Sequence, residues 1–150
     1  MYAGDILKNP MRAYRQSKLA MLMFARELQR RAEERGWKLL SIAAHPGWSA
    51  TRIVLNGMGQ GLRERFIQAV FNFIAQSADA GAMPMLHAAL AADVQPGGYY
   101  GPSRFDERRG SVAPSKVMGQ ARDDVAAARL WAVSEQLTGV TLPSAADAVR

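Results

Sequence analysis

Tyr14-Arg-Gln-Ser-Lys18 opens the stretch that decides the fold, and it continues Leu-Ala-Met-Leu-Met-Phe-Ala-Arg-Glu-Leu28. No proline or glycine interrupts the chain from Met11 to Arg35, and residues of high helix propensity dominate this run. Its apolar surface is wider than one stripe, which indicates cover from more than one side. We therefore predict one long helix over 11–35, ended by Gly36 as its C-cap.

Tyr14 and Lys18 are four residues apart, so a helix places them on one face and within reach of each other. A phenol is a poor acid or base at neutral pH because its pKa is about 10, and a neighbouring cation lowers that pKa. Bringing the pKa near 7 takes about 4 kcal/mol, which is more than one exposed lysine supplies. The pair is either acid–base machinery inside a cleft, or an ordinary helix face with a packed tyrosine and a solvated lysine.

Composition and charge exclude several classes of protein. The 150 residues, 49% of them hydrophobic and 21% charged, fit one soluble globular domain. There is no cysteine, and the two histidines have no ligand spacing, so neither a disulfide nor a metal site is expected. The net charge is +6, but the densest basic residues are interleaved with glutamates, as on a solvated helix face. No aromatic residues alternate with them, so nucleic-acid binding is not expected.

No segment is long and apolar enough to predict a membrane span, and the N-terminus lacks the pattern of a signal peptide. We therefore expect a cytoplasmic protein without a transmembrane segment.

A buried strand is predicted at Trp37–Ala44, because this short apolar run directly follows the helix. His45-Pro46-Gly47 then forces a turn at the carboxyl end of that strand, the edge of an α/β sheet where ligands bind. The remaining predicted elements are helices over 62–75, 77–92 and 123–137 and a short strand around 97–102. Ser77 is the expected N-cap of the 77–92 helix, and Gly139 is expected to end the last helix. Residues 103–118 are predicted to be irregular.

Two other features are open to a functional reading and are set aside. The glycines at 57, 59 and 61, followed by Asp79, are a poor dinucleotide loop because Leu62 stands where the third glycine is needed. His45 is interpreted as a turn residue and His87 as a helix-face residue, and neither is a better candidate base than Tyr14.

Several motifs, taken in order, resemble the short-chain dehydrogenase/reductase family, and most closely the C-terminal half of its retinol-dehydrogenase-like branch. The matching segments are Tyr14-x-x-Ser17-Lys18-Leu19-Ala20, His45-Pro46-Gly47-x-x-x-Thr51, Gln76-Ser77-Ala78-Asp79-Ala80-Gly81, Gly98-Tyr99-Tyr100-Gly101-Pro102 and Leu130-Trp131-Ala-Val-Ser134-Glu135. The resemblance implies an α/β fold, the C-terminal part of a Rossmann-like doubly wound parallel sheet, helix-rich and with one or two strands remaining. It implies a single partial domain over 11–140, with a loop at 1–10 and a loose tail at 141–150.

The same resemblance implies an NAD(P)-dependent alcohol dehydrogenase or carbonyl reductase acting on a small apolar alcohol or carbonyl compound. Tyr14 would exchange the proton with the substrate oxygen, and Lys18 would lower the tyrosine pKa and bind the nicotinamide ribose. Pro46, Gly47, Ser49 and Thr51 would hold the nicotinamide carboxamide of NAD or NADP. Residues 53–76 would form the substrate lid.

The chain also departs from the family pattern. The Gly-rich cofactor loop and the catalytic serine are not found, residues 1–13 contain no Ser or Thr, and Met21 stands where the branch usually has Asn. We therefore expect a truncated chain lacking the nucleotide-binding half, which by itself binds no nicotinamide cofactor tightly and turns over nothing. A non-catalytic remnant that acts only through protein–protein association is the alternative. The family also implies a homo-oligomer formed through the 11–35 helix.

Overall fold

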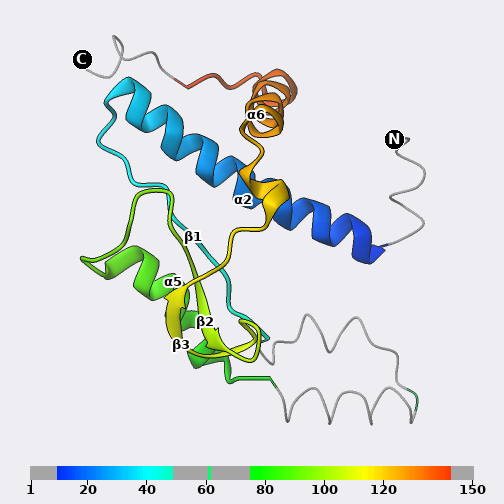
Figure 1. Cartoon of the computed structure of the whole chain (residues 1–150). Coiled ribbons are helices and arrows are strands. Elements are labelled where there is room, and N and C mark those ends of the chain that lie inside the picture. Colours follow the sequence, from blue (N-terminus) through cyan, green and yellow to red (C-terminus); the bar gives the residue numbers. More distant parts are fainter. Residues whose placement is uncertain (1–9, 49–60, 62–74, 143–150) are drawn as a thin grey trace. The chain divides into compact units, whose positions relative to one another are not determined.

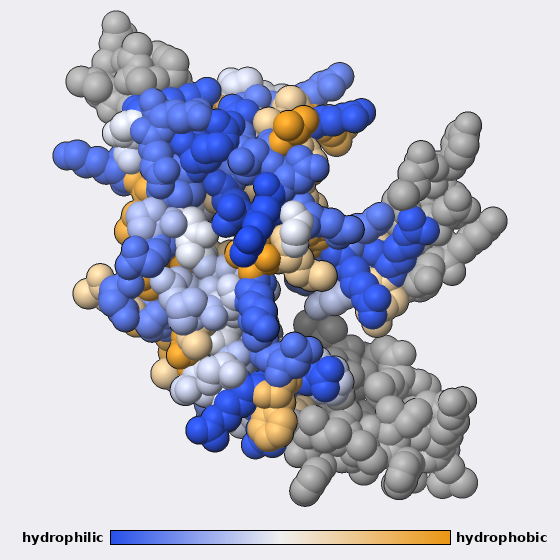
Figure 2. All heavy atoms as spheres, in the orientation of Figure 1, coloured by the Kyte–Doolittle hydropathy of each residue, from blue (hydrophilic) through white to orange (hydrophobic). Residues whose placement is uncertain are grey.

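The computed structural model describes residues 10–48, 61 and 75–142 (Figure 1). The chain divides into two compact units, one of Met1–Ile42 with Val117–Arg150 and the other of Ala43–Lys116. None of the described helices is long and apolar enough to cross a membrane. In the view of Figure 2, hydrophobic atoms lie in small separate groups among hydrophilic ones.

Helix α2, Pro10–Arg35, confirms the long helix predicted from the sequence. It begins at a proline, whose missing N–H costs nothing in the first turn. It ends where Gly36 adopts a left-handed φ of 66°. The amide of Trp37 donates to Ala32 O at 2.9 Å and that of Gly36 to Glu33 O at 3.2 Å. This pair of bonds is the Schellman arrangement that glycine favours at a helix C-terminus.

Helix α6, Asp124–Thr138, packs against α2 and follows a short 3₁₀ helix, η1, at Gly119–Arg122. The Asp123 side chain caps α6 by accepting from Ala126 N, and Gly139 ends it with a φ of 68°. The core between these elements consists of Met23, Ala121 and Ala127, with Leu19, Leu22, Val117, Ala126 and Leu130 packed around them.

Trp131 of α6 is the largest aromatic group in this contact and is 2% exposed. Its ring stacks on Phe24 with 4.7 Å between ring centres, and the Arg31 guanidinium lies 4.6 Å from its centre. Apolar burial and the cation–π contact therefore act on the same side chain.

The charged residues of α2 are not all solvated, contrary to the interpretation of this segment as a solvated face. Glu27 is 2% exposed and accepts hydrogen bonds from Arg30 at 2.6 and 2.8 Å and from Arg31 at 2.7 Å. The hydrogen bond from Arg30 is the main cause that lowers the pKa of Glu27 below its usual value, although burial opposes it. A carboxylate can be buried here because two guanidinium groups satisfy it.

The second unit contains a three-stranded sheet of order β1-β2-β3, formed by Ala43–Ala44, Tyr99–Arg104 and Arg109–Pro114. β1 pairs with β2 in parallel, and β2 pairs with β3 antiparallel. Helix α5, Ala78–Leu90, contacts all three strands and is capped by Ser77, whose hydroxyl accepts from Ala80 N at 3.2 Å. At the tip of the β2–β3 hairpin three consecutive residues have positive φ, namely Phe105, Asp106 and Glu107.

Two strand predictions were wrong in extent or number. The strand expected over Trp37–Ala44 is reduced to Ala43–Ala44. The neighbouring strand β2 begins at Tyr99, which pairs with Ala43, so residues before Ala43 have no strand partner in β2. Upstream, the Ser41 amide donates instead to Gln29 Oε1 of α2 at 2.8 Å. Strand β3 lies in the segment predicted to be irregular, so the described residues hold three strands rather than one or two. Its exposed first half, Arg-Gly-Ser, carries no alternating pattern.

Candidate functional site

Tyr14 and Lys18 lie one turn apart on α2, as their spacing requires. The Lys18 Nζ atom is 5.5 Å from the centre of the Tyr14 ring, a cation–π distance. Tyr14 is 56% exposed, Lys18 is exposed, and the Ser17 hydroxyl donates to the Tyr14 carbonyl at 2.7 Å. The helix thus brings the two predicted catalytic side chains together and presents them to the outside of this unit.

Pro46 and Gly47 form the turn after β1, and the turn is crowded. Gly47 has a φ of 63°, and a Cβ at this position would lie 2.5 Å from Arg108 O and 2.7 Å from Pro102 Cγ. The next amide, Trp48 N, donates to Arg108 O at 2.7 Å. Glycine is therefore required both by the left-handed backbone and by the close approach of the hairpin.

Polar groups of this turn are already used within the protein. Gly47 N donates to His45 Nδ1 at 3.2 Å, and Pro46 O accepts from Gln76 Nε2 at 2.6 Å. Trp48 O accepts from Gln76 N at 2.8 Å. These bonds fix the shape of the turn. The predicted residues Ser49 and Thr51, and most of the predicted lid at 53–76, lie outside the described residues.

His45 links the turn to the end of the hairpin. Because Gly47 N–H donates to Nδ1, the imidazole carries its proton on Nε2, which lies 3.0 Å from Ser115 Oγ and 3.4 Å from Glu107 Oε2. Burial lowers the pKa of His45 below its usual 6.5, while the charge of Glu107 opposes this. Both partners meet the same nitrogen, so the cluster is not a Ser–His–Glu triad, in which the base uses one nitrogen for each partner.

Two tyrosines near this cluster have structural roles. Burial raises the pKa of Tyr99 above its usual 10, the opposite of what an acid–base tyrosine needs. The Tyr100 hydroxyl accepts from Gln95 N at 2.8 Å, and its ring meets the edge of His87 at 4.9 Å between centres. His87 lies on a helix face, as the sequence suggested.

The sequence did not single out three residues that hold this region together: Gln76, Glu107 and Ser115. Gln76 lies inside one of the motifs, but its burial depends on partners 30 and 34 residues away in the chain. Glu107 accepts from Lys116 N at 2.8 Å in addition to facing His45. No local pattern in the sequence marks Glu107 or Ser115.

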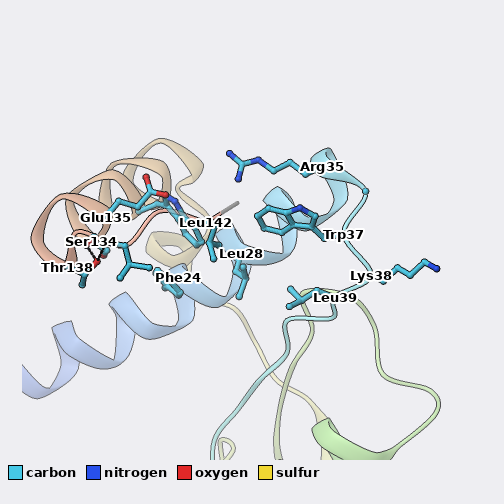
Figure 3. A pocket seen from close by; sticks show the side chains of 13 residues that line it. Phe24, Leu28, Arg35, Trp37, Lys38, Leu39, Ser134, Glu135, Thr138 and Leu142 are labelled. Atoms are coloured by element: carbon cyan, nitrogen blue, oxygen red, sulfur yellow. Dashed lines mark hydrogen bonds between the residues drawn. The ribbon is translucent and has the colours of Figure 1, made fainter. Parts of the chain in front are cut away.

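The first unit contains an open apolar pocket of about 1050 Å³ (Figure 3). It is lined by Phe24 and Leu28 of α2, by Trp37 and Leu39, and by residues of α6 and the segment after it. Tyr14 and Lys18 are not among its lining residues. In the second unit a hollow of about 610 Å³ is bordered by Gln76, Ser77, Arg104 and Arg109. Within the described residues no cluster of acidic groups and histidines could hold a metal ion.

Comparison with known proteins gives relatives along nearly the whole chain. It is 33% identical to human dehydrogenase/reductase SDR family member 13, over 89% of this chain and 33% of the relative. It is 36% identical to mouse retinol dehydrogenase 12, over 85% of this chain and 36% of the relative. The chain thus spans about a third of the length of the curated relatives it matches. No family model matches it.

A solved structure is also similar to this chain in sequence and in fold. The crystal structure of an uncharacterized protein from Mycobacterium Paratuberculosis is 37% identical in sequence and superposes with a TM-score of 0.65. The match covers 90% of this chain and 41% of that one. With the parallel β1–β2 pair and helix α5 packed against it, this match confirms the predicted fold class, a partial Rossmann-like α/β fold.

Gly47→Ala should destabilise the chain more than Gly139→Ala. Both glycines have nearly the same left-handed φ, but nothing lies within 4 Å of a Cβ at Gly139. The control should cost about 1–2 kcal/mol for the backbone alone, and Gly47→Ala about 1–3 kcal/mol more for the clash. Urea unfolding of both variants measures the difference. If both variants lose the same free energy of unfolding, the crowding at Gly47 is relieved at no cost.

His45 should make stability depend on pH. Since its pKa is lower in the folded chain than in the unfolded chain, the unfolded state binds more protons between the two values. The contribution of neutral His45 to the free energy of unfolding is therefore complete above about pH 6.5, and it is lost as the pH falls through the pKa of the folded state. Urea unfolding between pH 7.5 and 5 should show the loss, and His45→Gln should flatten it. An unchanged slope in that variant would exclude His45 as the source.

Proposed function

Because this chain is related by sequence to the short-chain dehydrogenase/reductase family, over about a third of the length of its relatives, we propose that the protein carrying it is an NAD(P)-dependent oxidoreductase that interconverts an alcohol and a carbonyl compound. The observation that carries the proposal is the Tyr14–Lys18 pair, exposed on one face of α2 with Nζ 5.5 Å from the ring. The acid–base role proposed for this pair comes from the resemblance to the family.

In the proposed reaction Tyr14 donates its hydroxyl proton to the carbonyl oxygen during reduction and takes one from the alcohol during oxidation. Lys18 favours the phenolate by its charge and holds the nicotinamide ribose. A nicotinamide cofactor, when bound, supplies or accepts the hydride.

The turn at Pro46 and Gly47 is proposed to guide the nicotinamide carboxamide. Its own polar groups are bonded to His45, Gln76 and Arg108, so it acts as a rigid support. Thr51 and the backbone near Ser49, which follow it in sequence, are proposed to make the polar contacts. A support of this kind fixes which face of the ring delivers hydride.

The substrate is proposed to be a small apolar alcohol or carbonyl compound. The support is compositional: the segment proposed as a lid contains Ile53, Val54, Leu55, Met58 and Phe66. The names of the relatives, which include a retinol dehydrogenase and a polyprenol dehydrogenase, are compatible with this class.

The catalytic roles are tested in a protein that joins this chain to a nucleotide-binding half of the family. Tyr14→Phe should lower kcat for carbonyl reduction about 100-fold or more and leave cofactor KM nearly unchanged, because only the proton is lost. Lys18→Ala should impair both constants. Tyr99→Phe and Lys38→Ala are the matched controls, since neither side chain is proposed to touch substrate. Near-normal turnover in Tyr14→Phe would overturn the assignment.

The α2 helix is further proposed to mediate self-association. Met21 is 63% exposed and lies one turn beyond Lys18, with partly exposed Phe24 beside it. Sedimentation velocity should show a dimer whose dissociation constant rises in Met21→Glu, because a charge is then placed in an apolar contact. Met118→Glu, at a methionine outside α2 that is 71% exposed, should have no effect. A clean monomer at high concentration would contradict this proposal.

A further inference from the structure

Gln76 is a buried amide placed where the turn, the hairpin and helix α5 meet. Its residue is 6% exposed, and it directly precedes Ser77, the cap of α5. Burying a primary amide is costly unless both its donor and its acceptor are bonded. Here Nε2 donates to Pro46 O at 2.6 Å and Oε1 accepts from Gly110 N at 3.3 Å. All of these groups belong to the Ala43–Lys116 unit.

The two partners also determine why glutamine stands here. Pro46 O can only accept and Gly110 N can only donate, so the side chain must offer one donor and one acceptor, about as far apart as the two ends of an amide. This pairing also fixes which end of the amide is oxygen and which is nitrogen. Glutamate would oppose Pro46 O with a second acceptor, and an apolar residue would supply neither the donor for Pro46 O nor the acceptor for Gly110 N.

The bond from Gln76 acts on the peptide group that joins Pro46 to Gly47. Proline has no N–H, so its carbonyl is its sole backbone hydrogen-bonding group. The next residues are held otherwise: Gly47 N by His45, and Trp48 N by Arg108 O. The peptide between Pro46 and Gly47 is therefore held at its oxygen by Gln76 and at its nitrogen by His45.

From this geometry we infer that Gln76 is a positioning residue of the cofactor site: it fixes the Pro46–Trp48 turn and thereby sets the position of the nicotinamide carboxamide. The part of the inference that concerns the cofactor rests on the proposed function. The part that says Gln76 fixes the turn rests on the hydrogen bonds alone. Gln76 acts through the turn and is not proposed to touch the cofactor or the substrate. Positioning of this kind matters because binding groups must be held within about 0.5 Å of their productive geometry.

The test uses Gln76→Glu and Gln76→Met in the protein that joins this chain to a nucleotide-binding half. Gln95→Glu is the matched control, because Gln95 also donates to a backbone carbonyl, Asp93 O at 3.1 Å, but is exposed and away from the turn. Hydrogen exchange at the Trp48 and Gly110 amides reports on the turn, and steady-state kinetics give the cofactor KM separately from kcat and from the substrate KM.

In both Gln76 variants the Trp48 amide hydrogen should exchange about tenfold faster and the cofactor KM should rise about tenfold. A tenfold change corresponds to the free energy of about one hydrogen bond. The substrate KM should not change. In Gln76→Glu, lowering the pH should restore the cofactor KM, because a protonated carboxyl can donate to Pro46 O again. Gln76→Met should show no such recovery. The Gln95→Glu variant should match the wild type in every measurement.

Exchange rates that do not change in either variant would overturn the hold on the turn. Faster exchange with an unchanged cofactor KM would overturn the positioning of the cofactor. A wild-type protein that binds neither NADH nor NADPH would overturn the proposed function and the cofactor part of this inference together, while the exchange data would still decide whether Gln76 fixes the turn. Gln76→Met introduces no buried charge, so it serves if Gln76→Glu fails to fold.

Discussion

The close approach between Gly47 and the backbone of Arg108 is the constraint on which the second unit depends. It brings the end of a parallel strand against the start of an antiparallel one, and no side chain larger than hydrogen fits between them. Once this contact exists, the Trp48 amide reaches Arg108 O, and Gln76 can bridge the turn to Gly110. The sheet, the turn and the start of α5 are therefore one hydrogen-bonded assembly rather than three independent elements.

The first unit is organised by a different principle. Helix α2 spreads its contacts around its circumference, with Met23 in the apolar core, Glu27 in a buried ion-pair cluster and Tyr14 exposed. A helix of 26 residues keeps these faces in fixed relation, so the spacing of Tyr14 and Lys18 is set by the backbone alone. The pair needs no tertiary contact to come together, although its chemistry needs surroundings that the helix does not provide.

Local signals in the sequence predicted most of the helices and their ends, because caps act within a few residues. Gly36, Ser77, Asp123 and Gly139 all stand where their conformations or side chains require them. The predictions from the sequence were wrong for strand β3 and for the length of β1, since the extent of both strands depends on their pairing with β2. They also missed Gln76 and Glu27, because a buried polar side chain is defined by its partners, and for Gln76 those lie far along the chain. The roles of Tyr14 and Lys18 came from family resemblance, not from their geometry.

The tip of the β2–β3 hairpin shows what kind of change this molecule can accept. Phe105, Asp106 and Glu107 all hold left-handed backbones, a conformation that costs non-glycine residues of the order of 1 kcal/mol each. That cost is retained because the tight curl returns the Glu107 carboxylate to the Lys116 amide and to His45. An inserted residue would carry the carboxylate out of reach, whereas a new side chain at the outward-facing Phe105 would not. Over evolutionary time the hairpin is therefore free to vary at Phe105 but constrained in its length and at Glu107.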